Sequence, residues 1–199
     1  MDTLLDAPLL PDRFTDWFAA RGWSPRPHQL AVLQGIHEHP SVLLTAPTGG
    51  GKTLAGFLPT LVDLARQAPG LSRPLHTLYL SPLKALAVDV RRNLETPVEE
   101  MGLPIRAESR TGDTPQSRRQ RQRRYPPDIL LTTPEQLALL LAYRDADRYF
   151  AGLRYVVVDE LHAMAPNKRG DLLALGLARL RSLAPDEAHI GCELSLIHI

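Results

Sequence analysis

Short apolar runs alternate along the chain with longer segments whose apolar residues recur at helical spacing. The apolar runs predict strands at residues 41–45, 75–80, 105–109, 128–132, 154–158 and 188–191. The intervening segments predict helices at residues 10–20, 28–37, 54–64, 81–100, 116–124, 133–142 and 168–183. Strands that alternate with helices are typical of the α/β class, a mainly parallel sheet with helices on both faces. In such sheets, ligands bind beyond the carboxyl ends of the strands.

A glycine-rich turn, residues 46–53 (APTGGGKT), follows the first predicted strand and precedes a predicted helix. Strand, glycine turn and helix form the context of a phosphate-binding loop, whose N–H groups point at phosphate oxygens. The helix start adds its positive dipole end. Ala46 departs from the strict pattern, which has glycine there, and the alternative is a plain flexible turn. The predicted ATP-binding residues of the loop are Ala46, Thr48, Gly49, Gly50, Gly51, Lys52 and Thr53.

Two residues of this loop and two acidic residues later in the chain have specific predicted roles in binding and hydrolysing ATP. Lys52 is expected to reach the β- and γ-phosphates, and the Thr53 hydroxyl is expected to ligate Mg²⁺. The β-branched run 154–158 then ends in Asp159 and Glu160. Asp159 is expected to hold Mg²⁺ opposite Thr53, and Glu160 to orient and deprotonate the attacking water. Two adjacent carboxylates in a solvated turn are the alternative.

Composition limits the class of protein. The 199 residues are 44% apolar and 23% charged, with a net charge of +1. No apolar run approaches the roughly 18 residues of a membrane span, and the start of the chain lacks a secretory pattern. Cys192 is the only cysteine, which excludes an internal disulfide. These features favour a cytoplasmic globular domain.

One charge run stands out. Five arginines fall within residues 118–124. Such a run is typical either of a nucleic-acid contact or of a solvated helix face, and the sequence favours neither.

The two nucleotide motifs together, residues 46–53 and 159–162 (DELH), resemble the DExH-box branch of superfamily 2 helicases. Residues 81–89, 110–114 and 132–137 resemble motifs Ia, Ib and Ic of the large helicase-related (Lhr) family, and residues 167–170 (NKRG) also suit it. The match runs over roughly residues 10–190. It is similar in particular to bacterial Lhr-like helicases described as associated with a DNA ligase in damage response.

The resemblance implies a RecA-like P-loop NTPase fold and an ATP hydrolase that moves 3′ to 5′ on single strands and opens DNA or RNA–DNA duplexes. It implies that Gln29 reads the adenine edge and that His162 couples the nucleotide site to movement elsewhere; a surface turn histidine is the alternative. The spacing of Trp23 from Gln29 departs from the family pattern, so a base-stacking role for Trp23 is not predicted.

Backbone phosphates are the expected ligands of five residues on strand-end loops. Hydroxyls, N–H groups and cations at these positions hold a strand without reading its sequence. Helix capping is the alternative role of Ser81 and Lys84, and for Thr132 and Thr133 capping can coexist with phosphate binding. The residues are Ser81, Lys84, Arg110, Thr132 and Thr133.

The expected organisation has three parts: N-terminal helices with a glutamine-motif-like segment at 1–40, a first RecA-like ATP-binding domain at 41–191, and a non-native tail at 192–199. The last six residues resemble the translation of a transposon end used in sequencing libraries. We therefore expect an N-terminal fragment that lacks the second lobe and its arginine finger, with negligible unwinding and very weak ATP hydrolysis.

Two other functions stay open at this point. One is a motor subunit of a restriction or remodelling system, which shares both nucleotide motifs. The other is a non-catalytic nucleic-acid-binding module that uses nucleotide as a conformational ligand.

Overall fold

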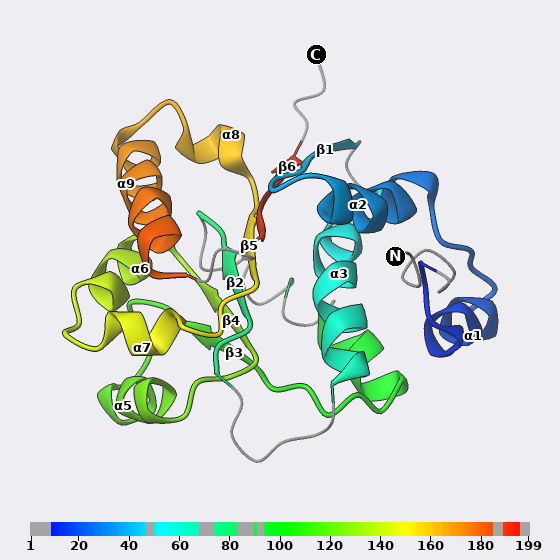
Figure 1. Cartoon of the computed structure of the whole chain (residues 1–199), viewed down its shortest axis with the longest axis horizontal. Helices are drawn as coiled ribbons and strands as arrows, with labels where there is room; N and C mark the ends of the chain where they lie inside the picture. Colours follow the sequence, from blue (N-terminus) through cyan, green and yellow to red (C-terminus); the bar gives the residue numbers. More distant parts are fainter. Residues whose placement is uncertain are drawn as a thin grey trace, which may run out of the picture.

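The computed structural model describes residues 9–46, 50–67, 74–82, 90, 94–184 and 189–195. Six parallel strands form one sheet in the order β1-β6-β5-β2-β4-β3 (Figure 1). The strands are β1 (Leu43–Ala46), β2 (Thr77–Leu80), β3 (Ala107–Arg110), β4 (Ile129–Thr132), β5 (Tyr155–Val158) and β6 (His189–Ser195). The α/β class predicted from the alternating pattern is confirmed.

Alternating side chains of the central strands build two separate cores. Tyr79, Leu131 and Val157 face one core, whereas Leu80 and Val158 face the other. Because successive residues of a strand point to opposite faces, a strand buried on both sides must be apolar at every position. This explains why the predicted strands read as continuous apolar runs.

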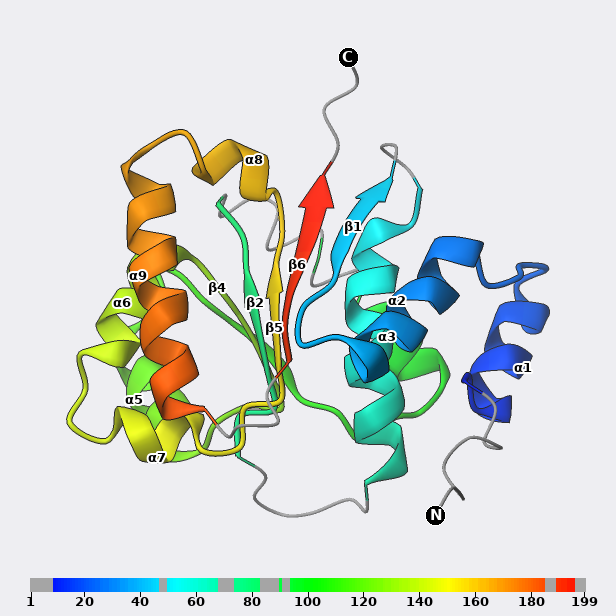
Figure 2. The ribbon, with the colours of Figure 1, turned by 45° about the horizontal axis from the view of Figure 1, so that its top comes forward.

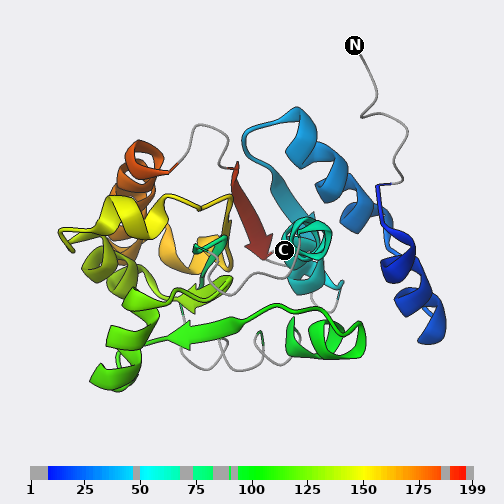
Figure 3. The same cartoon turned by 60° about the horizontal axis from the view of Figure 1, so that its bottom comes forward.

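Helices cover both faces of the sheet, as Figures 2 and 3 show. One face packs against α1 (Asp12–Ala20), α2 (Pro27–Glu38) and α3 (Lys52–Arg66), together with the helical residues 94–100. The other face packs against α6 (Pro134–Leu141), α7 (Ala146–Phe150), α8 (Leu161–Met164) and α9 (Lys168–Leu183). Helix α5 (Gln116–Arg124) lies beside α7 and buries only Gln122. None of the helices in the described ranges is long and apolar enough to cross a membrane.

The observed elements agree with the predicted ones except in two short helices and one strand, and the predicted helix at 81–100 lies partly outside the described residues. Helices α7 and α8 have five and four residues, too few to show a helical repeat in the sequence. Strand β6 continues to Ser195 and pairs Cys192 with Leu43 of β1. The predicted domain boundary after residue 191 therefore falls inside a strand, and the non-native origin of residues 192–199 stays a prediction.

Candidate nucleotide site

The described residues that were predicted to bind nucleotide and nucleic acid at strand ends lie at one edge of the sheet. Several of these residues follow the end of a strand. Gly50 and Gly51 come after β1, Ser81 after β2, Thr133 after β4 and Asp159 after β5. Because every strand is parallel, these positions lie together at the carboxyl edge, where ligands of open α/β sheets bind. The predicted residues Thr48, Gly49 and Lys84 lie outside the described residues, as does the side chain of Ala46.

The end of the predicted phosphate loop has the geometry of a helix start. Gly51 is the residue before α3 and has φ = 75°, a left-handed conformation that favours glycine. Lys52 and Thr53 open the helix, and the Ala55 N–H donates to the Gly51 carbonyl at 3.0 Å. The N–H groups in the first turn of any α-helix lack an acceptor within the helix, and for this reason helix starts are common anion-binding sites.

Gln29 is folded onto the phosphate loop. Its side chain is 3% exposed, and its Nε2 donates to the Gly51 carbonyl at 3.3 Å. Its Oε1 accepts from the Arg26 N–H at 2.9 Å. A Cβ atom on Gly51 would lie 3.0 Å from the Gln29 Nε2, closer than ordinary packing allows. Gln29 and Gly51 are therefore positioned by each other.

Asp159 is a buried carboxylate held by a buried phenol. The Tyr79 hydroxyl donates to Asp159 Oδ2 at 2.6 Å, and the Tyr79 ring stacks on Phe57 of α3 with centroids 4.8 Å apart. Burial raises the pKa of Asp159 above its usual value, and the Tyr79 hydrogen bond and nearby Lys52 partly oppose this shift. Such a carboxylate gains from a cation beside it.

Glu160 has the strained backbone of the site. It is the only non-glycine residue of the described chain with positive φ, at 53°, and it precedes α8. A left-handed conformation costs such a residue about 1–2 kcal/mol, which is typical of functional positions. The Glu160 Oε2 lies 3.3 Å from the Nε2 of His162, so these two predicted residues contact each other.

A cleft of about 800 Å³ joins these elements. Gln29, Lys52, Thr53 and Glu160 all line it. The cleft is also lined by a group that the sequence motifs did not identify, contributed by α1, the α1–α2 connection and the segment before residue 98: Trp17, Arg21, Trp23, Arg26, Thr96 and Pro97.

The two tryptophans of this group, Trp17 and Trp23, both contact the Arg21 side chain. The Arg21 guanidinium lies 5.2 Å from the Trp17 ring and 4.9 Å from the Trp23 ring, and it pairs with Glu100. Trp23 is 53% exposed. The spacing between Trp23 and Gln29 in the sequence did not predict a role for Trp23 in the site, whereas in the fold both residues line the same cleft.

The residues predicted to contact nucleic acid share the carboxyl edge but are buried. The exposed fractions are 2% for Ser81, 1% for Arg110, 2% for Thr132 and 7% for Thr133. The Arg110 Nη2 donates to the Tyr143 hydroxyl at 2.8 Å, and the Thr132 hydroxyl donates to the Arg110 carbonyl at 2.8 Å. As placed, these side chains offer little surface to a phosphate, and their nucleic-acid role stays a prediction.

A bidentate ion pair joins two segments of the family resemblance. Arg169 of α9 donates to both carboxylate oxygens of Glu135 in α6, at 2.6 and 3.1 Å. This pairing lowers the pKa of Glu135 to about 2. The neighbouring Gly170 has no room for a side chain, since a Cβ there would lie 2.7 Å from the Met164 carbonyl oxygen. The pair fixes α9 against the loop after β4.

Most arginines of residues 118–124 are engaged within the protein. Arg118 and Arg121 both pair with Glu108, Arg123 pairs with Asp145, and Arg119 donates to the carbonyls of residues 111 and 112. The charge run is therefore neither a fully solvated face nor an open row of free cations.

The comparisons with known proteins agree with this geometry. The family described as DEAD/DEAH box helicase matches residues 26–192. The chain is 41% identical to ATP-dependent helicase Lhr-Core protein 2 of Thermococcus barophilus over 94% of its own length and 23% of that protein. It is 46% identical to Lhr helicase/probable uracil glycosylase of Mycolicibacterium smegmatis, over 84% of this chain and 12% of that protein.

Solved structures give the same result. The structure of Mycobacterium smegmatis helicase Lhr bound to ssDNA and AMP-PNP matches with a TM-score of 0.79 and 42% identity, over 94% of this chain and 24% of that one. The DUF1998 helicase MrfA bound to DNA and AMPPNP matches with a TM-score of 0.80 and 28% identity, over 96% and 27%. The chain thus spans between 12% and 27% of the length of these four relatives.

Proposed function

This chain belongs to the DEAD/DEAH box helicase family and has Lhr helicases among its relatives, and from this premise we propose that it is the ATP-binding lobe of an ATP-dependent helicase. The observation that carries the proposal is the cleft in which Gln29, Lys52, Thr53 and Glu160 meet. These residues come from three separate segments of the sequence. Their convergence is what a nucleotide site requires and what a flexible glycine turn would not produce.

The donor set fits Mg·ATP. The Thr53 hydroxyl and the Asp159 carboxylate are the hard oxygen ligands that Mg²⁺ prefers. Mg²⁺ is usually bound by one or two carboxylates together with substrate phosphates, and Asp159 would supply such a carboxylate. When bound, Mg²⁺ would neutralise charge that develops on the transferred phosphoryl group.

Each residue then has one task. Lys52 and the N–H groups after Gly51 hold the phosphate oxygens. Tyr79 orients the Asp159 carboxylate through its hydrogen bond to Oδ2, and this carboxylate would help to hold Mg²⁺. Glu160 orients the attacking water and takes its proton, with His162 in contact.

The function of the full-length protein is inferred from its relatives. We propose that the full-length protein acts on single-stranded DNA or RNA–DNA hybrids through backbone phosphates, as the Lhr structure with ssDNA suggests for this family. Ser81, Lys84, Arg110, Thr132 and Thr133 remain the proposed contacts, through their N–H groups or after a local rearrangement that exposes them. A role in DNA repair beside a DNA ligase, in the cytoplasm, belongs to the same proposal.

The experiment that tests the proposal is ATP turnover by the full-length protein with single-stranded DNA. Glu160→Gln keeps the shape of the side chain but removes the base, so turnover should fall at least about 100-fold. The control is Glu99→Gln, an exposed acid outside the cleft, which should leave turnover unchanged. Undiminished turnover in Glu160→Gln would contradict the role of Glu160 as the base, and absence of turnover in the unaltered protein would favour a non-catalytic, nucleotide-gated binding module.

A further inference from the structure

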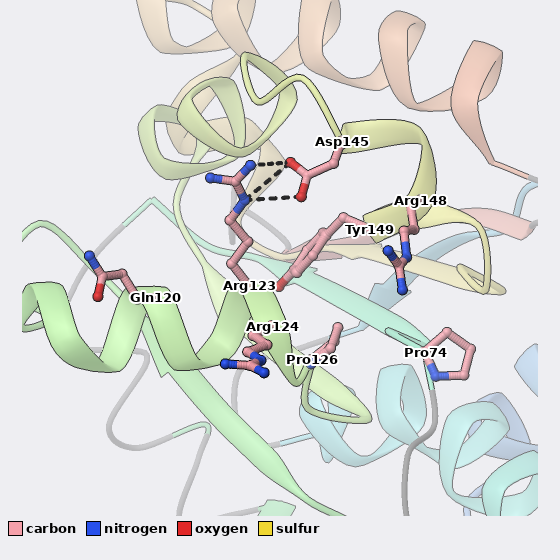
Figure 4. A pocket seen from close by; sticks show the side chains of 8 residues that line it. All are labelled: Pro74, Gln120, Arg123, Arg124, Pro126, Asp145, Arg148 and Tyr149. Carbon is pink, nitrogen blue, oxygen red and sulfur yellow. Dashed lines mark hydrogen bonds and ion pairs between the residues drawn. The ribbon is translucent and has the colours of Figure 1, made fainter.

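A second pocket lies at the opposite edge of the sheet from the nucleotide cleft. Its walls include Pro74, which precedes β2, and Pro126, which precedes β4, so it opens at the amino ends of the parallel strands. Its charged and polar lining comes from α5 and α7 and the turn before α7 (Figure 4). These residues are Gln120, Arg123, Arg124, Asp145, Arg148 and Tyr149.

The pocket has an excess of positive charge. Three arginines face one carboxylate, and Asp145 is already paired with Arg123, whose Nε lies 3.1 Å from both Asp145 oxygens. Arg124 and Arg148 have no ion pair with any residue that the structure describes. Three positive charges minus one negative charge leave a local excess of two.

A buried hydrogen-bond donor faces the same space. Tyr149 is 5% exposed, and its hydroxyl has no hydrogen-bond partner among the described residues. Burial raises the pKa of Tyr149, so the phenol keeps its proton. Figure 4 shows its hydroxyl end directed between α5 and the loop at Pro126. A ligand oxygen would supply the partner that this buried hydroxyl lacks.

The size and the charge of the pocket select a class of ligand. Its volume, about 640 Å³, is that of a small-molecule site and much larger than a bare phosphate needs. A carboxylate or a phosphodiester brings one negative charge, whereas a phosphate monoester brings about −1.5 to −2 at pH 7. The monoester matches the local excess of two positive charges and the neutral donor more closely than either singly charged group does.

We propose that this pocket binds a phosphate monoester on a nucleotide-sized group, with Arg124 and Arg148 on the phosphate oxygens and the Tyr149 hydroxyl as a further donor. The ligand is a free nucleotide or the 5′-phosphate end of a strand. This site is separate from the nucleotide cleft and does not rest on the proposed function, because none of its residues lines the cleft.

The test is an NMR titration of the chain with thymidine 5′-monophosphate, a 5′-phosphorylated oligothymidylate and the same oligonucleotide with a 5′-hydroxyl. We expect saturable shifts at the amides of Arg124, Arg148 and Tyr149 with the phosphorylated ligands, and at least tenfold weaker binding of the 5′-hydroxyl form. Tight binding of the monophosphate assigns a free nucleotide, and binding of the phosphorylated strand alone assigns a strand end. Equal binding of the two oligonucleotides would overturn the proposal.

Substitutions separate this pocket from general surface charge. Arg124→Gln with Arg148→Gln should weaken binding at least tenfold, and Tyr149→Phe severalfold. Arg144→Gln is the matched control, since Arg144 is an exposed arginine four residues before Arg148 that does not line the pocket. An equal loss in Arg144→Gln, or no loss in the double variant, would contradict the proposal.

Discussion

The nucleotide cleft and helix α5 both concentrate charged side chains, but they use them differently. In the cleft, Lys52 and Glu160 line an open space of about 800 Å³, and Asp159 is buried with a raised pKa. In α5, four of the five arginines are bound to carboxylates or carbonyl oxygens of the protein itself. The motif with fewer charges therefore contains the groups proposed to react, whereas most arginines of the charge run bind the protein itself.

This difference shows what a charge pattern can and cannot predict. The loop at 46–53 and the acids at 159–160 have defined spacing after strands, so the parallel sheet brings them to one edge. The α5 run has no such constraint. Its partners, Glu108 and Asp145, lie 10 or more residues away, and only the folded chain shows which arginines they bind.

The largest expected effect on stability concerns Tyr79, the buried residue of β2 that holds Asp159. Tyr79→Phe removes a buried hydrogen bond to a carboxylate and should lower the free energy of unfolding by about 2 kcal/mol at pH 7. Without the bond, the pKa of Asp159 in the folded state rises further. A carboxyl group whose pKa is raised by folding contributes stability to the folded protein at low pH, and this contribution is lost as pH rises through the raised pKa. The deficit should therefore be smaller near pH 4, as urea unfolding at both pH values would show. A deficit that is the same in Tyr125→Phe, an exposed tyrosine, would argue against the role of Tyr79.

A second substitution compares two left-handed glycines. Gly51→Ala and Gly102→Ala should each cost about 1 kcal/mol of unfolding free energy, since both positions have positive φ. Only Gly51→Ala also displaces Gln29, whose Nε2 would lie 3.0 Å from the new methyl group. ATP affinity, measured by calorimetry, should fall in Gly51→Ala alone. Equal loss in both variants would mean that Gln29 and Gly51 do not position each other for nucleotide.

The smallest effect belongs to α5. Arg121→Gln removes one of two exposed partners of Glu108 and should cost no more than about 0.5 kcal/mol. It should leave the salt dependence of nucleic-acid binding unchanged, because the arginine is engaged within the protein. A decrease of about one in the slope of log K against log salt would instead show a phosphate contact.

Sequence reasoning predicted the α/β fold, the α9 bounds 168–183 and the edge at which the site forms. Periodicity and glycine spacing act over a few residues, which is why these features are readable. Burial of Arg110 beneath Tyr143 and the Tyr79–Asp159 hydrogen bond depend on residues 33 and 80 positions apart. Likewise, Trp23 reaches the cleft through the packing of α1, which no local pattern encodes.

We propose that this chain binds ATP in the cleft lined by Gln29, Lys52 and Glu160. The most direct measurement is calorimetric titration of the chain with ATP, with and without Mg²⁺. Saturable one-to-one binding is predicted, strengthened by Mg²⁺ and weakened at least tenfold in Lys52→Ala, while the exposed control Lys168→Ala binds as the unaltered chain does. Undiminished ATP affinity in Lys52→Ala would contradict the account.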